Sequence, residues 1–184
     1  MKALNLYLLT RNIEDKDIPV YETVLSGREE AVKFRPEEIE TINRLVDCIS
    51  DKVSLKELDG FFYSFTIPQI GKEFDLLKIG DNRVVNIELK SRMVELNRIE
   101  RQLERNRYYL KHIADCIYSF TFVKDNETQH LYQYDGTLKE CSLKQLTNVL
   151  RKMDEYVDEN IEGLFKPGDY LVSPLNTPQK FLEN

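Results

Sequence analysis

The stretch Glu73–Lys90, EFDLLKIGDNRVVNIELK, contains two apolar runs on either side of a Gly-Asp-Asn turn. Turn-forming residues between two such runs are typical of a β-hairpin. If the turn is symmetric about Asp81 and Asn82, Asp75 lies directly opposite Glu88. A three-residue loop would instead shift the register by one and point the two carboxylates apart.

Two carboxylates that face each other across a hairpin destabilise the sheet unless something offsets their charge, because their Cβ atoms lie about 5 Å apart. Mg²⁺ or Mn²⁺ suits such a pair, since these ions bind one or two carboxylates and keep several waters. Lys90 shares the strand face of Glu88 and brings an ammonium able to orient water or balance phosphate charge. The alternative is a solvated hairpin face with a cross-strand ion pair.

The remaining chain gives an alternation of helices and strands, whereas residues 1–30 favour neither a helix nor a strand. Helical spacing of apolar residues predicts helices at 36–50 and 92–114, the second with Ser91 as a cap. A third helix is predicted at 142–153, with a continuation toward 164. Strands are predicted at 61–70, where Pro68 ends the strand or confines it to an edge, at 73–79, 83–89, 116–123 and 130–134.

The length of 184 residues predicts one compact domain, at 1–165, followed by an extended tail or linker at 166–184. Pro167, Gly168, Pro174 and Pro178 cannot sustain a helix in that tail. The abrupt end of the chain suggests a module of a longer protein.

Composition excludes several classes of protein. The net charge of −6 disfavours a protein that coats nucleic acid non-specifically, and no glycine-rich phosphate loop is encoded. Three scattered cysteines without a CxxC pair disfavour a disulfide framework and a structural zinc site, and two histidines exclude a histidine-rich metal site. No membrane span or export signal is evident, so we expect a soluble cytoplasmic protein.

The order helix, strand, strand with Asp75, strand with Glu88 and Lys90, helix, strand resembles the PD-(D/E)XK nuclease superfamily over about residues 36–134. This resemblance implies an α/β fold with a restriction-endonuclease-like core, a central mixed sheet flanked by helices. It implies that Asp75 and Glu88 bind the metal, that Lys90 assists the attacking water, and that Gln102 is the catalytic glutamine of the following helix. Phe74 stands where the motif has proline.

Many members of the superfamily add an acid on the first helix, and two residues compete for that role here. Glu38 lies at the edge of the apolar helix face and Glu40 on the polar side, so we prefer Glu38 as a further metal ligand. Glu73 shares the strand face of Asp75 and is either a supporting acid or, as we favour, a solvated residue at the strand end.

The helix at 92–114 has a local excess of basic residues. Arg98, Arg101 and Arg105 are candidates for phosphate contacts, and Tyr109, or its neighbour Tyr108, for stacking on a base. The alternative is a solvated helix with spaced ion pairs and aromatic residues in the core.

These features predict a Mg²⁺- or Mn²⁺-dependent nuclease, with DNA favoured over RNA as substrate. The alternative is a non-catalytic nucleic-acid-binding or assembly module of the same fold. Residues 168–181 resemble the connector that follows nuclease-like N-terminal modules of superfamily 1 helicases or ATPases, so a motor domain in the same longer chain is the expected partner. A small-molecule enzyme using carboxylates without metal ranks last, because no cofactor loop is present.

Overall fold

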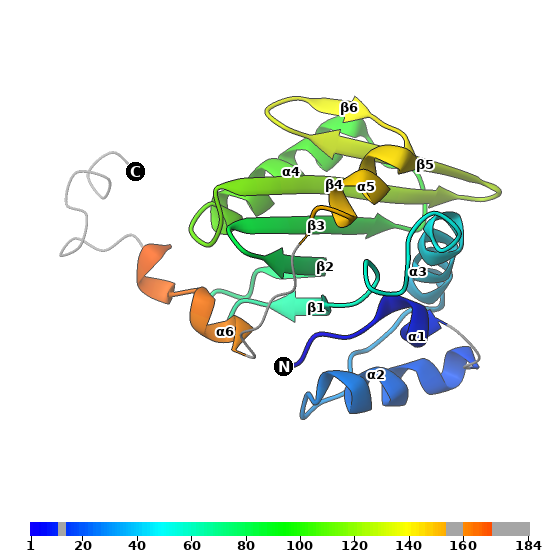
Figure 1. Ribbon diagram of the computed structural model, residues 1–184, viewed down its shortest axis with the longest axis horizontal. Coiled ribbons are helices and arrows are strands. Elements are labelled where there is room, and N and C mark those ends of the chain that lie inside the picture. Colours follow the sequence, from blue (N-terminus) through cyan, green and yellow to red (C-terminus); the bar gives the residue numbers. More distant parts are fainter. Residues whose placement is uncertain (11–13, 154–159, 171–184) are drawn as a thin grey trace.

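The computed structural model describes residues 1–10, 14–153 and 160–170, which form an α/β fold around a six-stranded mixed sheet flanked by helices (Figure 1). The strands follow the sheet in sequence order, and each neighbouring pair is antiparallel except the parallel pair β3–β4. Their bounds are β1 Phe61–Thr66, β2 Glu73–Gly80, β3 Arg83–Lys90, β4 Cys116–Asp125, β5 Thr128–Tyr134 and β6 Leu138–Glu140.

The hairpin of β2 and β3 forms in the predicted register, with paired residues running from Gly80 opposite Arg83 to Leu76 opposite Ile87. Its two-residue turn contains Asn82 at a φ of 51°, a left-handed conformation that asparagine tolerates well. The Asn82 amide also donates to the Asp115 carboxylate (2.9 Å) and its carbonyl oxygen accepts from the Asp115 N–H (2.8 Å). The turn is thereby tied to the start of β4.

Helix α4, Leu96–Leu110, makes the crossover that parallel strands require and is shorter than the predicted helix at 92–114. The expectation that Ser91 caps this helix is wrong, because Glu95 occupies the N-cap position. Ser91 directly follows β3, and the chain needs several residues to turn from the strand end onto the face of the sheet. At the other end, residues 111–113 form a turn closed by the Ile113 N–H on the Leu110 carbonyl (3.0 Å).

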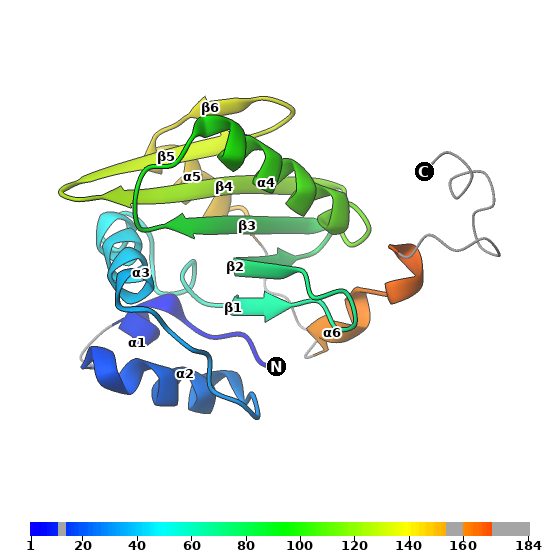
Figure 2. The ribbon, with the colours of Figure 1, turned by 180° about the vertical axis from the view of Figure 1, so that it is seen from behind.

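Helices cover both faces of the sheet (Figures 1 and 2). Helices α3, Pro36–Ile49, and α5, Leu143–Leu150, share one face and its main core. Helix α4 lies on the other face, where Ile99 and Leu103 pack against Val123 and Tyr132. Both views place the end of β3 beside α3.

The amino-terminal region, left open by the sequence, contains two short helices and a 3₁₀ turn among its described residues. Helix α1 spans Leu6–Thr10, the 3₁₀ turn η1 spans Asp15–Asp17 and α2 spans Ile18–Ser26. Leu4 forms an isolated antiparallel bridge with Phe61, at the start of the edge strand β1. Arg28 joins this region to the sheet, because its guanidinium bonds the buried Glu22 carboxylate (3.1 Å) and the Tyr63 carbonyl.

The carboxy-terminal part of the described chain packs on the same body. It comprises α6, Ile161–Leu164, and the 3₁₀ turn η2, Pro167–Asp169. Phe165 contacts the rings of Phe65 and Phe74, and Tyr170 is also buried. The described part of the proposed tail, residues 166–170, therefore contains a residue of the core, and residues 171–184 lie outside the described ranges.

Several predicted bounds change in the structure. Strand β1 stops at Thr66, before Pro68, and β4 and β5 extend beyond the predicted 116–123 and 130–134. Strand β6 was not predicted, and α5 ends at Leu150, while the expected continuation toward 164 falls partly on residues 154–159, outside the described ranges. No helix among the described residues is long and apolar enough to cross a membrane.

All three cysteines are free thiols. Cys48 and Cys141 are partly buried, and burial raises the pKa of both, that of Cys141 to about 11. Cys116 is exposed and lies at the start of β4, where it pairs with Arg83 at the start of β3.

Candidate active site

Asp75 and Glu88 lie at the same end of the β2–β3 hairpin, because Asp75 is near the start of β2 and Glu88 near the end of β3. They occupy the positions that follow the Leu76–Ile87 pair in the observed register. There the Asp75 Oδ2 atom accepts a hydrogen bond from the Leu89 N–H (2.8 Å). The carboxylate of one strand is thus fixed against the backbone of the other.

Glu88 is buried, with 1% of its surface exposed, and three side-chain amides hold its carboxylate. Its Oε1 atom accepts from Asn86 Nδ2 (3.1 Å) and from Asn106 Nδ2 (2.6 Å), and its Oε2 atom accepts from Gln102 Nε2. A solvated hairpin face, the alternative for this part of the sequence, does not describe such a residue. Glu88 belongs to a buried polar network that fixes the orientation of its side chain.

The network reaches across β3 and α4. Asn106 Nδ2 also donates to Asn86 Oδ1 (2.8 Å), so one amide of α4 binds two residues of β3. Sequence reasoning identified Gln102 but assigned no role to Asn106 or Asn86. The signal was available for both, because Asn106 is four residues after Gln102 on the same helix face and Asn86 shares the strand face of Glu88.

Burial and the nearby charge of Glu88 raise the pKa of Asp75 to about 7. The Leu89 N–H and the Lys90 ammonium act in the opposite direction but do not cancel the increase. The pair therefore carries negative charge that the surrounding protein compensates incompletely. A bound cation would relieve this excess.

A cleft of about 740 Å³ opens at this end of the hairpin, and we call it the carboxylate cleft. Asp75, Glu73, Glu38 and Lys90 are among its lining residues. Burial, followed by the charges of Glu38 and Asp75, raises the pKa of Tyr63, which also lines the cleft. The cleft thus gathers three of the acidic residues considered from the sequence.

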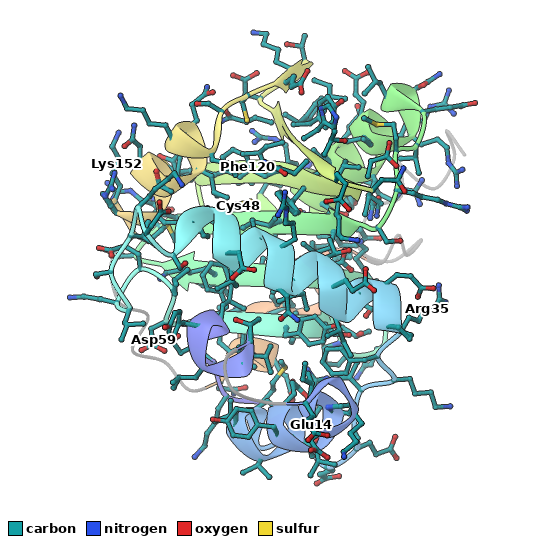
Figure 3. All side chains as sticks on the ribbon, turned by 90° about the vertical axis from the view of Figure 1, so that its right-hand side faces the viewer. Glu14, Arg35, Cys48, Asp59, Phe120 and Lys152 are labelled. Atoms are coloured by element: carbon teal, nitrogen blue, oxygen red, sulfur yellow. The ribbon has the colours of Figure 1, made fainter. Side chains whose placement is uncertain are left out.

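The two candidate acids of the first helix have different surroundings. Glu38 lines the carboxylate cleft, and its Oε2 atom accepts from the Arg35 N–H (3.2 Å) in the capping box of α3. Figure 3 shows Arg35 at this amino end of the helix. Glu40 instead binds Lys124 of β4 (2.8 Å) and does not line the cleft. The structure places Glu38, and not Glu40, in the cleft that Asp75 also lines.

Glu73 is exposed, in line with a position at the strand end, yet it also has a specific partner. Its Oε1 atom accepts a hydrogen bond from the Ser64 hydroxyl. The backbone of Ser64 has a φ of 48°. Both residues line the carboxylate cleft.

Gln102 and Lys90 make different contacts in the site. Gln102 donates to Glu88, so it acts on the carboxylate rather than on Lys90. Lys90 lines both the carboxylate cleft and a second pocket, and no acceptor or carboxylate in the described ranges lies within bonding distance of its ammonium. Its ammonium is available to a ligand in either space.

The predicted nucleic-acid-binding residues separate into two groups. Arg98, Arg101 and Arg105 are exposed and line the second pocket together with Gln102. Tyr109 does not line it, since its ring packs on Tyr170 with 5.2 Å between centroids and its carbonyl accepts from the Tyr170 hydroxyl (3.1 Å). The described structure gives Tyr109 a packing role.

The oxygen atoms of the two carboxylates are suitable ligands for a small divalent cation. Three amide donors leave the Glu88 carboxylate with acceptor capacity at Oε2, and Asp75 uses one oxygen on the Leu89 N–H. Across residues 1–10, 14–153 and 160–170 no three His, Cys, Asp or Glu side chains cluster as a metal cage. Mg²⁺ does not require one, because it binds one or two carboxylates and takes its other oxygens from water and phosphate.

Comparison with protein-family models, with curated proteins and with solved structures finds no match for this chain.

Proposed function

We propose that this chain is a metal-dependent nuclease with a restriction-endonuclease-like core, acting on DNA in preference to RNA. The observation that carries the proposal is the pair Asp75 and Glu88, which neighbouring strands bring to one end of the sheet beside Lys90. The raised pKa of Asp75 supports it, because the charge of Glu88 contributes to the increase and a cation would offset it. The element order α3, β1, β2, β3, α4, β4 agrees with the order expected for that core.

Each residue has a role that follows from its contacts. Asp75 and Glu88 would hold the metal, and Glu38, which lines the carboxylate cleft together with Asp75, would contribute a further carboxylate. Gln102 is a positioning residue, since it fixes the Glu88 carboxylate that binds the metal. The metal, when bound, supplies a Lewis acid that activates water and offsets phosphate charge.

Lys90 acts on the reacting groups directly. Its ammonium faces the cleft next to the carboxylate pair, where it can orient the attacking water or stabilise charge that develops on the phosphate oxygens. The flexible lysine stem suits both tasks, because the ammonium is a compact charge with three rotatable donors.

The test is cleavage of labelled single- and double-stranded DNA and RNA in Mg²⁺ and in Mn²⁺. We compare the unsubstituted chain with Asp75→Asn and Glu88→Gln, and with Asp81→Asn as a control in the turn at the other end of the same hairpin. We expect cleavage that needs the metal, a rate at least about a hundredfold lower in the first two variants, and no change in the control. Cleavage that survives both substitutions would contradict the assigned site.

A second candidate function is a non-catalytic nucleic-acid-binding or assembly module, with a helicase or ATPase domain as its partner. The burial of Glu88 under three amide donors favours it, because such a carboxylate also serves as a structural centre. Calorimetry with Mn²⁺ separates the two functions. Absent cleavage together with absent Mn²⁺ binding supports the module, whereas binding that Asp75→Asn removes supports the nuclease.

A further inference from the structure

A pocket lined by basic side chains adjoins the carboxylate cleft, and we call it the basic pocket. It has a volume of about 580 Å³ and shares Lys90 and Val94 with the cleft. Its lining contains five cationic side chains, two amides and one valine, and no carboxylate: Lys72, Lys90, Val94, Arg98, Arg101, Gln102, Arg105 and Asn106. In a chain with a net charge of −6, this is a local reversal of charge.

Helix α4 sorts its charges onto different sides. The Glu100 carboxylate accepts from the Leu138 N–H of β6 (3.3 Å). Burial, followed by the charges of Glu104 and Glu100, raises the pKa of Tyr134 in β5. These acids therefore face the β5–β6 side, while the arginines at 98, 101 and 105 line the basic pocket. In the described ranges no carboxylate lies within ion-pair distance of these arginines.

The placement of these arginines opposes the stability of the helix itself. Arg98, Arg101 and Arg105 follow a spacing of three and four residues, at which like charges repel. Arg98 also lies in the first turn of α4, where the helix dipole disfavours cations and no acidic residue is present. An anion in the pocket would reverse both effects.

Lys72 adds a charge from outside the helix. It lies in the connection between β1 and β2, and burial, helped by the charge of Arg105, lowers its pKa, although Glu88 and Asp75 act in the opposite direction. Its ammonium donates to the Glu73 carbonyl and lies 4.9 Å from the centre of the Phe74 ring. Three separate chain segments thus direct cations into one space.

We propose that the basic pocket binds a phosphate group of a nucleic-acid strand whose neighbouring phosphodiester lies in the carboxylate cleft, with Lys90 between the two. This inference rests on the proposed function for the identity of the strand. Arginine forks match phosphate oxygens in two-point contacts, and a helix amino terminus adds a favourable dipole for an anion. The strand is held by its backbone on one side of the bond that is cut, so binding is independent of base sequence.

The experiment measures binding apart from cleavage, by fluorescence anisotropy of internally labelled oligonucleotides with the 184-residue chain. Asp75→Asn serves as the background, with a chelator present, so that no strand is cut. We compare this background with Arg101→Gln/Arg105→Gln added, and with Lys111→Gln added as a control that removes a cation of the same region outside the pocket. Thermal unfolding checks that each variant is folded.

We expect the double substitution to weaken binding about tenfold or more at 0.1 M salt and to reduce the salt dependence by about 0.7 in slope for each lost contact to a single strand. The control should keep the affinity and the slope. Unchanged affinity and slope in the folded double variant would overturn the proposal.

Oligonucleotides with different ends distinguish a terminal phosphate from an internal one. A terminal phosphate in the pocket predicts that the loss is confined to strands with a 5′- or a 3′-phosphate, and an internal phosphate predicts an equal loss with a circular strand. Either pattern supports the pocket. If the unsubstituted chain cleaves no strand under any condition but the arginine substitutions still weaken binding, the nuclease function alone is rejected. If the chain cleaves nucleic acid but the arginine substitutions do not change binding, this inference alone is rejected.

Discussion

Asn106 links the Glu88 carboxylate to the Asn86 side chain, because its Nδ2 atom donates to both. We expect Asn106→Ala to weaken Mn²⁺ binding about 10- to 100-fold, the usual cost of losing a residue that orients a metal ligand. The loss of buried hydrogen bonds should also lower the free energy of unfolding by about 1–3 kcal/mol. Calorimetry and urea denaturation measure the two effects.

Asn97→Ala is the matched control for this substitution, because Asn97 is an exposed residue of the same helix. It should change neither quantity beyond about 0.5 kcal/mol. If Asn106→Ala lowers stability but leaves Mn²⁺ affinity unchanged, the amide has only a structural role.

The raised pKa of Asp75 predicts how the metal-free protein responds to pH. The folded chain holds the Asp75 proton up to a pKa of about 7, whereas an unfolded aspartate loses it near 3.9. The folded state therefore binds more protons between these values, and its stability falls as pH rises through that window. We expect the free energy of unfolding of the unsubstituted chain, measured with a chelator present, to fall between pH 5 and pH 8 by about 2 kcal/mol more than that of Asp75→Asn.

Urea denaturation at the two pH values measures this difference, and the asparagine variant removes contributions from other groups by subtraction. Adding Mg²⁺ at pH 8 should restore stability to the unsubstituted chain and not to the variant, because a ligand that binds only the folded state stabilises it. If the free energy of unfolding depends on pH equally in both proteins, the pKa of Asp75 is not raised in the folded chain.

At the scale of the elements, the hairpin was predictable and the crossover helix was only partly so. The two-residue turn fixes the register of β2 and β3, so Asp75 and Glu88 followed from local sequence. The start of α4 depends instead on how far the chain must travel from the end of β3, which periodicity does not encode. Strand β6 has three residues and exists through its pairing with β5, so no local signal predicts it.

Glu38 has a double position, at the third residue of α3 and at the rim of the carboxylate cleft, and two substitutions separate its roles. Glu38→Gln keeps an acceptor for the Arg35 N–H but removes the charge, so we expect weaker Mg²⁺ binding and little change in stability. Glu38→Ala also removes the cap and should cost about 1 kcal/mol of unfolding free energy. Calorimetry and thermal unfolding measure both. If Glu38→Gln leaves the metal affinity unchanged, Glu38 caps the helix and does not bind the metal.

At the scale of the whole molecule, the Arg28 side chain connects the amino-terminal helices to the sheet. Glu22 is fully buried, and Arg28 joins it to the Tyr63 carbonyl of β1. Arg28→Ala should lower the free energy of unfolding by about 3 kcal/mol, because it leaves a buried carboxylate without its partner. Urea denaturation measures this loss. Lys16→Ala, which breaks an exposed ion pair with Glu14, is the control and should cost less than 1 kcal/mol.

This connection explains why the first 30 residues could not be assigned from the sequence. The pair Arg28 and Tyr63 joins positions 35 residues apart, and the bridge between Leu4 and Phe61 joins positions even more distant. Short helices are marginal alone and form here because tertiary packing covers their apolar residues. A local pattern therefore carries little information about them.

The position of Cys116 makes the molecule suitable for attachment of probes. Cys116 pairs with Arg83 at the opposite end of β3 from Lys90, about 23 Å away at the rise of a strand. It is exposed, whereas the partly buried Cys48 and Cys141 have raised pKa values and react slowly as thiols near neutral pH. A maleimide dye or a tether to a glass surface would thus attach at one defined point and leave the cleft free to engage a stretched strand in single-molecule recordings.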